Sequence, residues 1–168
     1  MIDVALSELS KWLAATPLSH IIQTTSWFIP TIQIIHILGV AVLFSSAVLV
    51  DLRIWRLLER DIPLAQVARR FLPPIWPVLL ILLITGSLPI VGEPRRSLLN
   101  STFYLKMALL AVAIMLTAGL QRSISSSPNS WDKDRGRRLA ARFAATASIA
   151  LWCGILFAGR WIAYTQTG

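Results

Sequence analysis

The sequence predicts an all-α integral membrane protein, an up-down four-helix bundle preceded by a short N-terminal amphipathic helix at the membrane interface. Three observations predict this fold. Hydrophobic residues make up 55% of the 168 residues, and the mean hydropathy of +0.66 is high for a soluble domain. Four stretches are long and apolar enough to cross a bilayer, where only helices satisfy their own backbone groups. Basic residues gather between alternate stretches.

The pattern of residues 1–24 predicts a segment that lies on the membrane surface. Apolar residues recur there at helical spacing, at Ile2, Leu6, Leu9 and Leu13. Thr16 and Pro17 have the pattern of an N-cap and a first-turn proline, which indicates a second short helix.

The bundle is predicted over residues 25–168, with spans at about 27–50, 74–92, 98–120 and 139–164. Each is close to the roughly 20 helical residues that a bilayer core requires. Pro30 is expected to kink the start of the first span. The Ser- and charge-rich segment 123–138 is typical of a linker.

The distribution of charge predicts the orientation. Of the 16 Lys and Arg residues, five lie between the first two spans, and six lie between the last two or at the start of the fourth. The positive-inside rule therefore predicts a multi-pass protein of the bacterial inner membrane, with two cytoplasmic basic loops and both termini in the periplasm.

The net charge of +8 does not predict a nucleic-acid partner. The chain has no basic stretch interleaved with aromatic residues and no Gly-rich phosphate loop. We expect the basic loops to lie against anionic lipid. The bilayer is therefore the predicted partner, and nucleic acid is not.

His36 is the central candidate for a functional site, because it lies within the apolar stretch TIQIIHILGV, residues 31–40. Gln33, one turn earlier, is expected to hydrogen-bond the imidazole, and Gly39 to leave space beside it. An axial haem ligand needs such a slot and a partner that fixes its tautomer. The alternative is a histidine that only makes an interhelical hydrogen bond.

Other polar residues are predicted at a similar depth in the outer leaflet. Thr85, Gly86 and Ser87 lie near the end of the second span, Lys106 in the third and Arg160 in the fourth. Lys106 is expected either to extend its amine to the interface or to pair with an anion. A haem propionate, a quinone oxygen or an anionic substrate would suit, and Arg160 fits the same role.

A second axial ligand is harder to place. His20 precedes His36 by sixteen residues, about 24 Å along a continuous helix. It is a candidate ligand only if the N-terminal segment folds back over the first span; otherwise it is a surface histidine. Asp51, near the end of the first span, opposes the helix dipole. We expect it to pair with a basic residue of a neighbouring segment.

Three motifs carry a resemblance. At HILG…DLR (36–53), FYLK (103–106) and GRWIAY (159–164), nearly the whole chain resembles an uncharacterised family of small four-span bacterial membrane proteins. More loosely, its first-span histidine and third-span lysine are similar to the pattern of the HemJ protoporphyrinogen oxidases and CopD-like membrane domains. HemJ proteins are four-helix haem b proteins, so the resemblance implies that His36 ligates haem and that Lys106 is functional.

We therefore expect a membrane redox or electron-transfer protein that binds haem b, or a quinone, in the outer leaflet through His36. Gln33 and Gly39 would shape the site, and Lys106 and Arg160 would hold anionic groups. A redox protein or a quinone would be its partner, and the chain would be monomeric or oligomeric. The alternative is a non-catalytic membrane subunit or anchor for a periplasmic or membrane protein.

Overall fold

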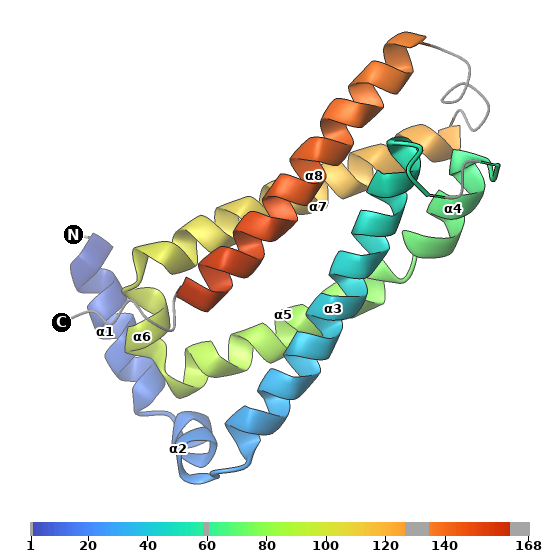
Figure 1. Cartoon of the computed structure of the whole chain (residues 1–168). Helices are drawn as coiled ribbons and strands as arrows, with labels where there is room; N and C mark the ends of the chain where they lie inside the picture. Colours follow the sequence, from blue (N-terminus) through green and yellow to red (C-terminus); the bar gives the residue numbers. More distant parts are fainter. Residues whose placement is uncertain (1, 59–60, 127–134, 162–168) are drawn as a thin grey trace.

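A computed structural model shows eight helices in the residues that it describes, 2–58, 61–126 and 135–161 (Figure 1). In chain order they are α1 (Ile2–Ala14), α2 (Pro17–Thr24), α3 (Phe28–Ile54), α4 (Leu64–Phe71), α5 (Ile75–Gly92), α6 (Pro94–Leu98), α7 (Ser101–Ser126) and α8 (Arg135–Trp161). No strand occurs within these ranges. The predicted all-α class is confirmed.

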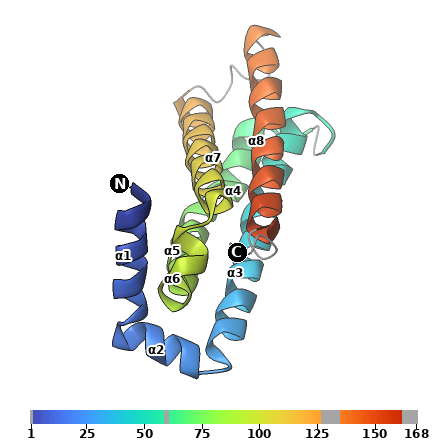
Figure 2. The same cartoon turned by 90° about the vertical axis from the view of Figure 1, so that its left-hand side faces the viewer.

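The N-terminal helices pack against one end of the bundle. Thr16 caps α2 by accepting a hydrogen bond from the Ser19 backbone N–H, and Pro17 opens the helix as predicted. Figure 2 shows α1 running beside α5 and α6, with α2 crossing below them. The Gln23 Nε2 donates to the Gly92 carbonyl at 2.7 Å, which joins the end of α2 to the end of α5.

We predicted that Pro30 kinks the start of the first span, but the change of direction lies earlier in the chain. The chain turns between α2 and α3, before Phe28, and Pro30 lies in the first turn of α3. A backbone N–H in the first turn has no partner within its helix, so a proline there removes no helical hydrogen bond.

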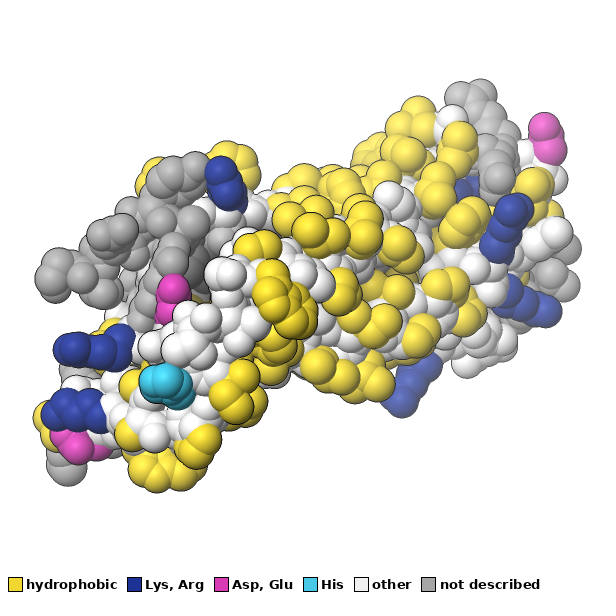
Figure 3. Space-filling view, turned by 90° about the horizontal axis from the view of Figure 1, so that it is seen from below, with side chains coloured by type: hydrophobic (Ala, Val, Ile, Leu, Met, Phe, Trp, Pro, Cys, Tyr) yellow, Lys and Arg dark blue, Asp and Glu magenta, His cyan; other side chains and the backbone are white. Residues whose placement is uncertain are grey.

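Four helical segments are long and apolar enough to cross a membrane: α3, the α4–α5 segment, α7 and α8. They overlap the four predicted spans, and residues 162–164 of the fourth lie outside the described residues. Figure 3 shows hydrophobic side chains over the middle of the molecule, whereas Lys, Arg, Asp and Glu lie toward its two ends. This distribution supports a multi-pass membrane protein. The predicted linker is shorter than expected, because α7 continues to Ser126 and α8 begins at Arg135.

The long helices form two pairs, α3 with α5 and α7 with α8, and the pairs meet mainly where α3 packs against α8. Figure 1 shows that the pairs converge near α4 and diverge toward α2. We call these regions the α4 end and the α2 end. The buried core lies where the pairs converge. It includes Leu43, Val50, Leu72, Ile124 and Ala145.

Asp51 lies buried in the contact between α3 and α8, with 2% of its surface exposed. Its carboxylate is hydrogen-bonded by Ser148 of α8, and its Oδ2 has no hydrogen-bond partner among the described residues. The basic partner that we expected is therefore replaced by a hydroxyl. Arg53 follows two positions later on another face of α3, where its Nε donates to the Ile62 carbonyl at 2.7 Å.

Gly39 leaves room for the Leu82 side chain where α3 packs against α5, because a Cβ at this position would lie 3.0 Å from Leu82 Cδ2. We expect Gly39→Ile to lower the free energy of unfolding by about 1–3 kcal/mol, the usual cost of overpacking. Thermal unfolding in detergent measures this. Gly119→Ile is the matched control, since a Cβ at Gly119 meets nothing within 4 Å. Equal effects of the two substitutions would contradict the assigned role of Gly39.

Candidate functional site

His36 lies half-buried on α3, facing α5 in the part of the bundle where the two helix pairs diverge. Its Nδ1 is 2.8 Å from the Oγ1 of Thr85 on α5. Thr85 is buried, with 7% of its surface exposed. This contact depends on the close approach of α3 and α5, which Gly39 permits three residues after His36. Packing between the two helices thus orients the imidazole.

The hydrogen bonds around Thr85 define the tautomer of the neutral imidazole. The Thr85 hydroxyl is also 2.8 Å from the Ile81 carbonyl, which can only accept. The single hydroxyl proton is therefore donated to Ile81, and Oγ1 accepts from the Nδ1–H of His36. The neutral ring then carries a lone pair on Nε2. Such a nitrogen can ligate a metal or accept a proton.

Gly86 leaves space beside the imidazole. A Cβ at this position would lie 3.4 Å from the Cε1 of His36, the carbon between the two ring nitrogens. Any larger side chain would therefore meet the edge of the ring close to Nε2. The adjacent residues Thr85 and Gly86 have complementary effects, one fixing the ring and the other leaving its edge uncovered.

Lys106 approaches the imidazole from the second helix pair. It lies half-buried on α7, and its Nζ would be 3.6 Å from a Cβ at Gly159 of α8. The lysine side chain thus crosses α8 where a glycine leaves room. Its ammonium is close enough to act electrostatically on His36. A cation and an imidazole from different helix pairs therefore lie in the same layer of the bundle.

Several predicted site residues lie in surroundings that differ from those that we predicted. The hydrogen bond expected from Gln33 is made by Thr85, and Gln33 is exposed. Gly39 faces Leu82 of α5, so it serves helix packing and does not form a slot. His20 is exposed on α2, and no hydrogen bond or ring contact joins it to His36. Arg160 follows Gly159 and is exposed, with interactions of its own.

Sequence reasoning placed Thr85 and Gly86 at the right depth but gave them no role, and it missed Gly159. The signal in α5 is the polar interruption TGS in an otherwise apolar helix. Pro89 adds to this interruption, because it has no N–H to donate to the Thr85 carbonyl four residues earlier. Gly159 gave no such signal, because its role depends on where the Lys106 side chain lies.

The described residues contain no group of three or more His, Cys, Asp or Glu side chains arranged to hold a metal ion. A lone imidazole retains a metal when other donors come from a cofactor, as the four nitrogens of a porphyrin do. Two small clefts of the described structure lie at the α4 end, and neither is lined by His36 or Lys106.

Comparison with known protein families gives one match. A family described as "Family of unknown function (DUF6644)" matches residues 9–165, nearly the whole chain. No curated protein and no solved structure matches the chain.

We expect Thr85→Val to release the imidazole tautomer, because valine has a similar shape but cannot accept the Nδ1 proton. Nitrogen NMR of the neutral His36 ring should show a single Nδ1–H form in the parent protein and a mixture of the two tautomers in the variant. Ser87→Ala is the control, since the Ser87 hydroxyl bonds only to the Ile84 carbonyl. An unchanged tautomer in Thr85→Val would contradict the assignment.

Proposed function

We propose that this chain, which belongs to the DUF6644 family, is a membrane redox or electron-transfer protein that holds haem b through the Nε2 of His36. The observation that carries the proposal is the hydrogen bond from the imidazole to Thr85, which leaves a lone pair on Nε2. Metal-bound histidines commonly donate their other ring N–H to such a second partner. Haem b with an axial imidazole supplies one-electron redox chemistry.

The surrounding residues fit the two chemically different parts of a haem. Gly86 places no side-chain atom beside the Cε1 of His36, and a flat macrocycle bound at Nε2 would need this side of the ring to stay clear. Lys106 provides a cation on the facing helix pair, where a propionate would neutralise it. An ammonium that loses water in the membrane needs such an anion or a path to the interface. A single group would thus satisfy both side chains.

The proposed location is the outer half of the bacterial inner membrane. The basic residues at the α4 end favour a cytoplasmic position for that end, with the α2 end and both termini on the periplasmic side. With haem bound at His36 and Lys106, the protein would then exchange electrons with a periplasmic redox protein or a membrane quinone.

Absorption spectroscopy of the detergent-purified protein, supplied with haem, tests the ligand. We expect a Soret band in the parent protein and its loss in His36→Ala, because the iron would lose its axial imidazole. His20→Ala is the matched control and should keep the full band, since His20 is exposed on α2. A sample without a Soret band, or an unchanged band in His36→Ala, would remove the haem proposal.

The role of Lys106 is tested by titrating haem into Lys106→Met, which preserves length and removes the charge. We expect Kd to rise about tenfold, equivalent to about 1.4 kcal/mol, from the loss of one charge-assisted contact. Lys11→Met is the control, because Lys11 is exposed and pairs with Glu8 on α1. An equal Kd in Lys106→Met and the parent protein would exclude a propionate contact.

Two other results would point to other functions. The purified protein could lack haem and retain an extractable quinone that His36→Ala loses. This result would identify a quinone as the ligand of His36. A colourless protein that co-purifies with another polypeptide and tolerates His36→Ala would be a membrane subunit or anchor. Both results would contradict the haem proposal.

A further inference from the structure

Two buried polar atoms on α3 and α8 have no hydrogen-bond partner among the described residues. One is the Oδ2 of Asp51 on α3, and the other is the Nε1 of Trp152 on α8. The two residues are 2% and 5% exposed. A buried polar group without a partner loses its hydrogen bonds to bulk water and gains none in return, so native proteins contain few such groups. An acceptor and a donor left unpaired on two packed helices point to a molecule bound between them.

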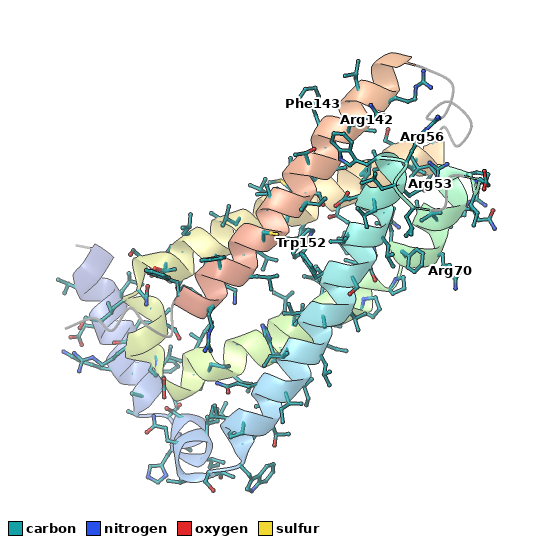
Figure 4. All side chains as sticks on the ribbon, viewed as in Figure 1. Arg53, Arg56, Arg70, Arg142, Phe143 and Trp152 are labelled. Atoms are coloured by element: carbon teal, nitrogen blue, oxygen red, sulfur yellow. The ribbon has the colours of Figure 1, made fainter. Side chains whose placement is uncertain are left out.

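Both atoms lie close to a hydrogen bond that joins α3 to α8. The Ser148 hydroxyl of α8 donates to the Asp51 carboxylate, and the oxygen that accepts is Oδ1, because Oδ2 has no partner. Trp152 follows Ser148 by four residues, so the two share one face of α8. Their Cβ atoms are about 5–6 Å apart, the usual separation at this spacing. Figure 4 shows Trp152 on the side of α8 that faces α3.

The directions of the two helices bring the unpaired atoms toward each other. Figure 1 shows that α3 runs toward the α4 end, whereas α8 runs away from it. Helical side chains lean toward the N-terminus of their own helix. Asp51 therefore leans toward the α2 end, and Trp152 leans toward Ser148 and the level of Asp51. The acceptor and the donor thus face one enclosed position between α3 and α8.

We propose that α3 and α8 hold a water molecule that joins Asp51 to Trp152. The indole N–H can only donate a hydrogen bond, and the carboxylate oxygen can only accept one. A water molecule accepts from the N–H and donates to Oδ2, so it satisfies both atoms at once. Each bond is about 2.8 Å long, and such a bridge therefore joins atoms about 4–6 Å apart. Buried water molecules typically pair with polar groups that lack a protein partner.

The chemistry of the two groups favours water over an ion. A metal cation at Oδ2 would leave the indole N–H directed at a positive charge, and the described residues supply no group of three His, Cys, Asp or Glu side chains to hold it. An anion would be repelled by the Asp51 carboxylate. Water also fits the neutral acid, because its oxygen can accept from two donors.

Nuclear magnetic resonance of the full chain in detergent, without haem, tests this inference independently of the proposed function. The seven tryptophans are labelled with nitrogen-15, and the spectrum of Trp152→Phe identifies the Trp152 indole. We expect a rotating-frame Overhauser contact between its N–H and water, with the sign that distinguishes a bound molecule from proton exchange. Asp51→Leu should abolish this contact, because a water molecule with a single protein partner is not retained.

Two variants serve as controls. Asp61→Leu removes an exposed acid and should leave the water contact unchanged. Asp51→Asn should also keep the contact, because the amide offers either an oxygen or an N–H to the water. The Trp76 indole is the reference for a bond made directly to protein, since its Nε1 donates to the Gln121 Oε1 at 2.8 Å. Unchanged resonances of the other indoles show that each variant is folded.

Three results would overturn the proposal. A parent protein without a contact between the Trp152 N–H and water would exclude the site, whatever the variants show. A scalar coupling across a hydrogen bond, from the Trp152 nitrogen to the Asp51 carboxyl carbon, would show that the two side chains bond directly. An equal water contact in Asp51→Leu and the parent protein would mean that Asp51 does not hold the water.

Discussion

The close approach of α3 and α5 is the contact on which the candidate site depends. Gly39 allows Leu82 to lie against the α3 backbone, and the same approach brings Thr85 within hydrogen-bonding distance of His36. Without this contact the imidazole would have no fixed tautomer and no defined orientation. One glycine therefore links the packing of the first helix pair to the chemistry that its histidine can perform.

The second helix pair, α7 and α8, contributes a cation to the candidate site. Lys106 extends along α8 over Gly159, so its amine is directed by helix packing and not by a hydrogen bond among the described residues. The imidazole offers a lone pair, and the amine offers positive charge. Because each belongs to a different helix pair, a ligand that contacted both would also hold the pairs together at the α2 end.

The two ends of the bundle thus have distinct physical characters. At the α4 end, the pairs converge on an apolar core, and arginines surround a cleft at its margin. At the α2 end, the pairs diverge, and the short helices α1, α2 and α6 pack beside them.

The sequence by itself determined the four spans, the amphipathic N-terminal segment and the cap of α2, because apolar length and local capping patterns act over short distances. It also identified His36 and Lys106 as unusual residues for a membrane interior. Only the tertiary structure decided that Thr85, and not Gln33, bonds the imidazole, and that Ser148 faces Asp51. These partners lie on other helices, and the rotation and approach of packed helices depend on side chains far apart in the chain.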